Sequence, residues 1–130
     1  MTARDQVLDL LAGYCRAVDD RELDKLWRLF DADCEYTFVD GAVAHGADEI
    51  REMLGGRIAG AIRHRHILTN TILEIEGDTA RAKSDWYLIK PAAGQAWDIE
   101  GAGYYQDEMR RSPDGWVFTR RQISPAPRGQ

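Results

Sequence analysis

The sequence predicts an α+β domain, because apolar residues recur with helical spacing in its first half and alternate, as in strands, in its second half. Up to about residue 54 the apolar positions are three or four apart, except for a short alternating segment at 34–39. From residue 63 onward, the turn signals Gly77-Asp78 and Pro113-Asp114-Gly115 separate alternating segments. Helices followed by a run of hairpins are typical of an antiparallel sheet with helices on one face.

Three helices are expected. Thr2-Ala3-Arg4-Asp5 matches the capping pattern Ser/Thr-x-x-Asp/Glu, so the first helix begins there. Asp19-Asp20-Arg21 interrupts its apolar pattern, and a second, shorter helix follows over 23–30. A third helix begins near Ala47, and Gly55-Gly56 weakens or ends it.

Five strands are expected, because alternation recurs in five segments. The segments are 34–39, 63–76, 79–90, 95–110 and a last one that begins at Trp116. In the last strand Trp116, Phe118 and Arg120 share a face, and Gly101 and Gly103 mark a bulge or a sharp bend in the strand before it. We therefore expect one domain over 1–124 and a flexible C-terminal tail over 125–130.

Composition excludes several classes of protein. The chain has 130 residues, 44% of them hydrophobic and 30% charged, which fits one globular domain. A net charge of −5 argues against a nucleic-acid partner, because phosphate binding needs a basic surface. No apolar run approaches the roughly 20 residues of a membrane span, and no signal peptide is recognisable. Cys15 and Cys34 read as buried free thiols, so we expect a cytoplasmic protein that neither spans nor binds a membrane.

The stretch from Arg63 to Asn70 holds two of the three histidines. Strand alternation places His64, His66, Leu68 and Asn70 on one face, which reads as the wall of a pocket. A carboxylate at Asp19, where the first helix ends, could hold His66 in one tautomer and make it a general base. The alternatives remain that Asp19 caps the next helix and that His66 is an ordinary core or surface residue.

Other polar and apolar side chains would complete such a pocket. Tyrosine hydroxyls could donate hydrogen bonds to a substrate oxygen, or they could be core aromatics with hydroxyls at the rim. Arg120 could pair with Asp107 or Glu100, or bind a substrate anion. His64 and His66 have no obvious third partner, so no metal site is expected. The predicted substrate-binding residues are Tyr14, Tyr36, Phe38, Met53, Leu68, Asn70, Ser84, Trp86 and Tyr105.

In their order and spacing, short segments along the whole chain resemble the SnoaL-like branch of the nuclear transport factor 2-like superfamily, nearest to scytalone dehydratase. The resemblance implies a cone-shaped domain, in which a curved mixed or antiparallel sheet wraps around the N-terminal helices and encloses a deep pocket. The segments are Tyr14 to Asp24, Leu29 to Asp33, Gly46 to Ile50, Arg65 to Asn70, Gly77 to Ala80, Gly103 to Asp107, and Gly115-Trp116 with Arg120.

The resemblance also implies a chemistry. In scytalone dehydratase and related enzymes, a helix-end Asp and a strand His form a dyad that removes a proton during elimination, and Asp19 and His66 match those positions. Ser84 stands where scytalone dehydratase has a second active-site histidine, and Val18 where it has a tyrosine.

We therefore expect a cofactor-independent lyase or isomerase, with His66 as base and Asp19 as its partner, acting on a small, largely apolar cyclic substrate. Other readings are a non-catalytic ligand-binding or accessory protein, a polyketide cyclase-like enzyme, or a small subunit of a ring-hydroxylating dioxygenase. The outer face of the sheet, with Ile67, Thr69, Thr71 and Leu73, could form a homodimer or homotrimer.

Overall fold

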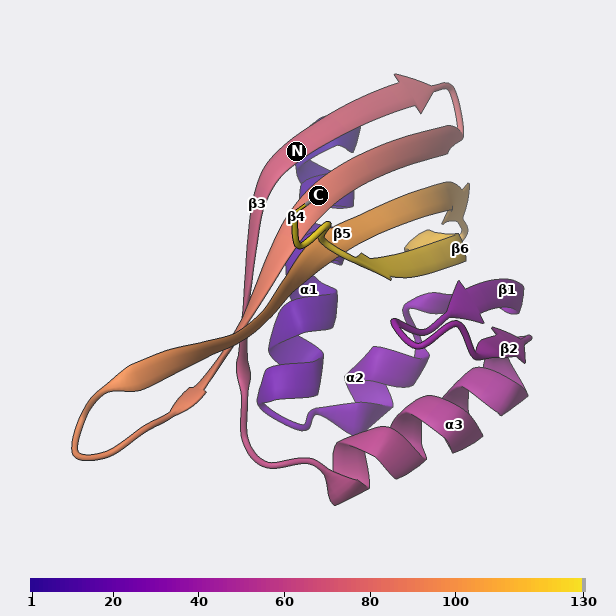
Figure 1. Cartoon of the computed structure of the whole chain (residues 1–130). Coiled ribbons are helices and arrows are strands. Elements are labelled where there is room, and N and C mark those ends of the chain that lie inside the picture. The colour runs from indigo at the N-terminus through magenta and orange to yellow at the C-terminus, as the bar shows by residue number, and fades with distance from the viewer. Residues whose placement is uncertain (130) are drawn as a thin grey trace.

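The computed structural model describes residues 1–129, which form three helices and a six-stranded sheet (Figure 1). The sheet order is β2-β1-β6-β5-β4-β3, and all neighbours are antiparallel except β1 and β6. The predicted α+β class is thereby confirmed. The elements are α1 (Ala3–Asp19), α2 (Leu23–Trp27), β1 (Phe30–Thr37), β2 (Val43–His45), α3 (Ala47–Gly60), β3 (Arg65–Glu76), β4 (Thr79–Pro91), β5 (Trp97–Ser112) and β6 (Gly115–Pro125).

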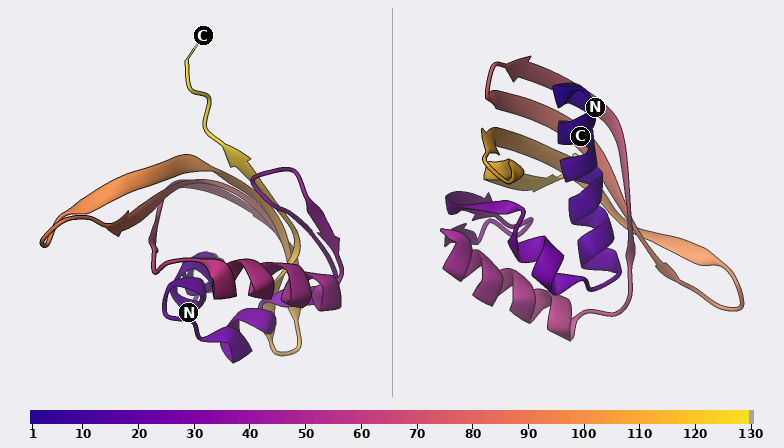
Figure 2. Two further views of the ribbon diagram at one scale, coloured as in Figure 1. Left: turned by 60° about the horizontal axis from the view of Figure 1, so that its bottom comes forward. Right: turned by 180° about the vertical axis from the view of Figure 1, so that it is seen from behind.

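The helices lie on one face of the sheet, and the sheet arches over them (Figure 2). The C-terminal end of β4 and the N-terminal end of β5 continue past the helices as a twisted hairpin that projects from the body of the molecule (Figure 1). The core lies between α1 and the concave face, where aromatic side chains from α1, β1, β5 and β6 pack edge to face. This arrangement brings the C-terminal end of α1 next to the start of β3.

Both ends of α1 have a local cause. At the N-terminus, the Thr2 hydroxyl accepts from the Asp5 backbone N–H and the Asp5 carboxylate accepts from that of Thr2, as the capping pattern predicts. At the C-terminus, Arg21 adopts a left-handed φ of 55°, and the N–H groups of Arg21 and Glu22 return to the carbonyls of Val18 and Ala17. This Schellman motif ends the helix directly after Asp19.

A β-bulge in β3 corrects the predicted strand faces. Asn70 has a left-handed φ of 54°, and the pairing of β3 with β4 shifts between Thr69 and Ile72. Before the bulge His66 and Leu68 face inward, as predicted. After it the alternation is inverted, so that Thr71 and Leu73 face the core while Ile72 is 71% exposed. The predictions that Asn70 faces the pocket and that Thr71 and Leu73 face outward were wrong.

A second register shift, between β5 and β6, corrects the last strand. Glu108 pairs with Arg120 and Met109 pairs with Phe118, so Thr119 of β6 is the extra residue between the two pairs. Trp116 and Phe118 share a face, as predicted, and both are buried. Arg120 is exposed instead of sharing that face, and Arg121 is completely buried in its place.

Three further boundaries differ from the expectation. The three-residue strand β2 was missed, and its His45 pairs with Glu35 of β1. Helix α3 continues through Gly55-Gly56 to Gly60, because Ile50, Leu54 and Ile58 bury one face of it. Strand β6 includes Pro125, the first residue of the predicted tail, and Gln130 lies outside the described residues.

Candidate functional site

Asp19 and His66 meet where the last turn of α1 contacts the first residues of β3. The Asp19 Oδ1 atom lies 2.6 Å from His66 Nδ1, and Oδ2 accepts a hydrogen bond of 2.8 Å from the His66 backbone N–H. The Asp19 side chain is 4% exposed and the imidazole is 17% exposed. Two bonds from one carboxylate fix both the backbone and the ring of His66, so the pairing predicted from the sequence exists in the structure.

Two arginines from the entry to β3 contact the end of α1. Arg65 Nε lies 3.9 Å from Asp19 Oδ2, and Arg65 Nη1 lies 2.8 Å from Asp20 Oδ1. Arg63 donates to the Asp19 backbone carbonyl at 3.4 Å. The hydrogen bond from Arg65 lowers the pKa of Asp20. The end of α1 is therefore a negatively charged turn that positive side chains from the β3 entry hold in place.

The alternative that Asp19 caps α2 does not hold. The N-cap of α2 is Glu22, and no side chain of the described chain makes a capping hydrogen bond there. Both carboxylate oxygens of Asp19 are instead directed at His66.

The pairing of Asp19 with Nδ1 determines what the other ring nitrogen can do. A carboxylate only accepts hydrogen bonds, so the proton of the neutral imidazole lies on Nδ1 and the lone pair on Nε2. Among the described residues, no side chain hydrogen bonds to His66 Nε2. A ring held in this tautomer, with a free and basic nitrogen, has the geometry of a general base.

A second polar group lies deeper, where the Tyr14 and Tyr36 hydroxyls hydrogen bond to each other. Burial raises the pKa of Tyr36 well above its usual value, and burial likewise raises the pKa of Tyr14, so both are protonated donors. Two hydroxyls that share one bond leave one O–H group free to donate elsewhere. Tyr105 packs edge to face on Tyr14, with ring centroids 6.0 Å apart.

Sequence reasoning missed the charged pair beneath these tyrosines. Arg121 donates from Nε and Nη2 to the two oxygens of Asp107, at 2.8 and 2.9 Å, and both side chains are completely buried. The Arg121 Cζ atom lies 3.8 Å from the ring centroid of Tyr105 and 4.2 Å from that of Tyr14. Arg121 Nη1 is buried without a partner in the described chain. The adjacent arginines Arg120-Arg121 were the available signal, since either could face inward.

Of the remaining predicted residues, all but Asn70 lie on the inward side of the sheet or on the helices that cover it. Leu68 and Trp86 are cross-strand partners on the inward face, next to His66 and Leu88, and Met53 is half-buried on α3. Ser84 is buried and bonded to Thr71 at 2.9 Å, while Phe38 packs under Arg57 beside Tyr36. Asn70 is outside the site altogether and donates to Asp85 on the outer face at 2.8 Å.

The space beside the dyad is small in this conformation. A hollow of about 40 Å³ lies between the ends of α1 and α3 and the segment that enters β3, and its lining includes Asp19, Ile58 and His64. Deeper inside, the aromatic side chains of Tyr14, Tyr36 and Tyr105 pack against one another.

Two other chemistries find little support in these residues. Among residues 1–129, no three His, Cys, Asp or Glu side chains lie close enough together to hold a metal ion. Burial raises the pKa of Cys15 to about 11 and that of Cys34 to about 12, so both are protonated thiols rather than nucleophiles.

In the described part of the chain no helix has the length and apolar character to cross a membrane.

The comparisons with known proteins agree with the fold. The family model described as the SnoaL-like domain matches residues 1–122. An uncharacterized protein of Mycobacterium tuberculosis is 29% identical over 123 residues, which cover 91% of this chain and 82% of that protein.

Two solved structures from Novosphingobium aromaticivorans are also similar. One, described as a candidate aromatic ring hydroxylase, is 27% identical with a TM-score of 0.82, over 96% of this chain and 90% of that one. The other, described as a candidate scytalone dehydratase, is 22% identical with a TM-score of 0.82, over 95% and 84% of the two chains.

Proposed function

The chain belongs to the SnoaL-like domain family, and we propose that within it the protein is a cofactor-independent lyase or isomerase that uses His66 as its base. The substrate would be small, largely apolar and cyclic. The observation that carries the proposal is the Asp19–His66 pair, which holds the imidazole by Nδ1 and leaves Nε2 free. The structural likeness to a candidate dehydratase supports the same reading of the fold.

In the proposed elimination, His66 Nε2 removes a proton from a substrate carbon. The electron pair of the broken C–H bond forms a carbon–carbon double bond, and the C–O bond to the leaving hydroxyl breaks. The imidazolium, stabilised by Asp19, returns its proton to the departing hydroxide, so that water is released. The free O–H of the Tyr14–Tyr36 pair donates to a substrate oxygen. An isomerase would use the same base and return the proton to a different carbon.

Substrate entry requires the structure to open. The hollow beside Asp19, at about 40 Å³, is smaller than a cyclic substrate, and His66 is not among its lining residues. Access of a substrate to His66 Nε2 would therefore need the connection at 61–64 and the end of α3 to move away from α1. Arg21 Nη2 donates to the Ala61 carbonyl at 2.8 Å, and His64 pairs with Glu100, so these contacts would break or adjust on entry.

The test is turnover of cyclic hydroxy compounds, followed by the ultraviolet absorbance of the new double bond. For any compound that is turned over, we expect His66→Gln to lower kcat by about 10²- to 10⁴-fold, because a general base contributes that much. Asp19→Asn should also lower kcat, and His45→Gln, the same change at an exposed histidine of β2, serves as the matched control. A His66→Gln variant that keeps the full rate would refute the proposal.

A second candidate is a non-catalytic ligand-binding member of the family, for which the hollow would have to open in the same way. Such a protein would bind apolar cyclic compounds without converting them, and His66→Gln would leave their affinity nearly unchanged.

We also propose that the protein acts in the cytoplasm as a homo-oligomer, since its two cysteines are buried free thiols and one face of its sheet is uncovered.

A further inference from the structure

The connection between α3 and β3, residues 61–64, is bonded to the end of α1 at two points. Arg21 Nη2 donates to the Ala61 carbonyl at 2.8 Å, and Arg63 Nη1 donates to the Asp19 carbonyl at 3.4 Å. Both are bonds from an arginine to a backbone carbonyl, and both join the connection to the turn that carries the carboxylate of the dyad.

A third contact joins the connection to the sheet. His64 Nε2 hydrogen bonds to the carboxylate of Glu100 on β5, and β4 lies between β5 and β3 in the sheet. The contact therefore crosses over β4 on one face of the sheet. That face is the concave one, because His64 lines the same small hollow as Asp19 of α1 and Ile58 of α3.

A β-bulge in β5 frees Glu100 for this contact. Leu88 pairs with Gly101, and the next residue of β4 pairs with Ile99, so Glu100 is the extra residue between the two pairs. The extra residue of a bulge is left out of the regular pairing, and bulges often re-aim a side chain next to a functional site. The carboxylate only accepts hydrogen bonds, so His64 is the donor.

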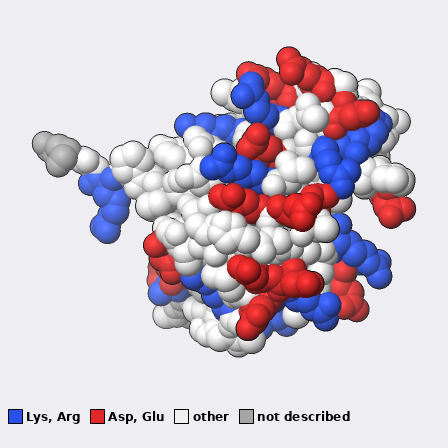
Figure 3. Space-filling view, turned by 90° about the vertical axis from the view of Figure 1, so that its right-hand side faces the viewer, with Lys and Arg blue, Asp and Glu red and all other residues white. Residues whose placement is uncertain are grey.

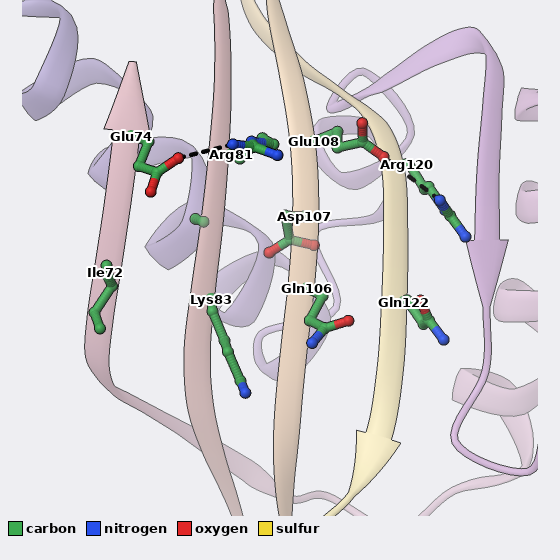
Figure 4. A pocket seen from close by; sticks show the side chains of 10 residues that line it. Ile72, Glu74, Arg81, Lys83, Gln106, Asp107, Glu108, Arg120 and Gln122 are labelled. Carbon is green, nitrogen blue, oxygen red and sulfur yellow. Dashed lines mark hydrogen bonds and ion pairs between the residues drawn. The ribbon is translucent and has the colours of Figure 1, made fainter.

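The connection borders the side from which His66 can be reached. The hollow that it lines measures about 40 Å³. A larger hollow of about 550 Å³ lies over β3 to β6, but it opens on the outer face of the sheet, away from the helices (Figure 4). Because the His66 ring faces inward toward Asp19, that larger hollow gives no route to it.

We propose that His64 and Glu100 form a latch that holds the connection at 61–64 closed, and that its release opens the way to His66 Nε2. The latch controls access to the base rather than the chemistry at it, so Glu100 is a positioning residue that touches no substrate. The inference rests on the proposed function in taking His66 as the group that a ligand must reach.

The experiment measures the initial rate at which diethyl pyrocarbonate acylates His66 in the full chain. The reagent attacks an unprotonated imidazole nitrogen, which at His66 is Nε2 because Nδ1 is bonded to Asp19. Mass spectrometry of the tryptic peptide 66–81 gives the rate, since that peptide contains no other histidine. We expect Glu100→Ala to raise the rate about two- to fivefold, the effect of losing one partly exposed pair.

Three further variants separate the latch from other causes. Asp98→Ala removes an exposed carboxylate two residues away on the same strand and should leave the rate unchanged. His64→Ala should raise it as Glu100→Ala does, and the double variant should raise it no further, because both changes remove the same contact. Additive effects in the double variant, or a rise as large in Asp98→Ala, would overturn the proposal.

Hydrogen exchange checks that the fold is intact. The amide groups of β6 should exchange at the wild-type rate in every variant, so that a faster reaction of His66 reports the connection alone. A matching rise in β6 exchange would assign the effect to unfolding and would overturn the latch, as would a His66 rate that Glu100→Ala leaves unchanged.

The measurement needs no substrate, so it distinguishes the latch from the catalytic proposal. A raised His66 rate in Glu100→Ala, together with no turnover of any cyclic hydroxy compound, would support the latch and refute the catalysis. An unchanged rate, together with loss of turnover in His66→Gln, would refute the latch and support the catalysis.

Discussion

Asp19 occupies a position where a carboxylate is electrostatically disfavoured, because the C-terminal end of a helix carries the negative end of its dipole. Its burial adds a desolvation cost. In the structure both costs are offset by two hydrogen bonds to His66 and by the arginines at positions 63 and 65. A residue that conflicts with its local environment and is satisfied by a distant partner is typical of a functional site.

The buried pair of Asp107 and Arg121 leads to a stability prediction. Asp107→Asn leaves the Arg121 guanidinium charged and without its partner, and should lower the free energy of unfolding by about 3–5 kcal/mol. The double variant Arg121→Met/Asp107→Leu removes both charges and should be far closer to the wild type, since well-packed apolar residues replace such pairs with little loss.

Urea denaturation followed by circular dichroism measures both variants. The control is Glu108→Gln, a charge removed from the outer face of the same strand, where we expect a change within about 0.5 kcal/mol. If Asp107→Asn were as mild as that control, the ion pair would not contribute to the stability of the core.

At the scale of single elements, β-bulges decide which residues face the site. Alternation along the sequence predicted His66 and Leu68 correctly, because the pairing of β3 is regular up to Thr69. It placed Asn70 on the wrong face, since one extra residue inverts all later positions. The same effect exchanged Arg120 for Arg121. Neither bulge contains a glycine, so the residue types in these segments do not reveal where the alternation is inverted.

The bulge in β3 can be tested at Asn70. Asparagine tolerates the left-handed conformation that this residue adopts, at a φ of 54°, whereas a β-branched residue does not. We expect Asn70→Val to lower the free energy of unfolding by about 1–2 kcal/mol. Asn70→Gly, which accepts this φ without strain but loses the exposed hydrogen bond to Asp85, should stay within about 1 kcal/mol of the wild type.

Urea denaturation distinguishes the two substitutions. Equal effects of Val and Gly would contradict a role for the left-handed conformation and would point to the Asp85 hydrogen bond instead.

Glycines illustrate why local propensity is a weak guide to element length. Gly55-Gly56 predicts a weakened or terminated helix, yet α3 continues to Gly60 because its buried face packs on the rest of the fold, where Gly55 approaches Trp27. Gly103 is required by packing rather than by backbone conformation, since a Cβ atom there would lie 2.4 Å from the Trp86 ring. The missing Cβ atom lets Trp86 lie across β5, a contact that the sequence pattern does not predict.

At the scale of the whole molecule, the order of helices and hairpins was predictable because it follows from local periodicity. The dyad was predicted from an aspartate at a helix end, an inward histidine on a strand and the resemblance to a family with that pair. The filling of the interior was not, since it depends on how the aromatic side chains of four separate elements pack. The row of exposed charges on the outer face was missed for a related reason, because it appears only when the strands are in register. The row consists of Glu74, Arg81, Glu108 and Arg120.

The charges on the surface of the molecule are mixed in sign, and the absence of a nucleic-acid partner stays a prediction. On the face shown in Figure 3, acidic and basic side chains are interspersed rather than gathered by sign. A mixed surface of this kind suits recognition by a surface of matching pattern better than the binding of a polyanion.

The central claim is that α1 and β3 together hold His66 as a base with its lone pair on Nε2. ¹⁵N NMR of the imidazole measures this directly in the neutral ring, with His66→Gln to assign the signals. We predict protonated Nδ1 and unprotonated Nε2 in the wild type, and loss of that single tautomer in Asp19→Ala. A wild-type ring protonated on Nε2, or a spectrum that Asp19→Ala leaves unchanged, would contradict the claim.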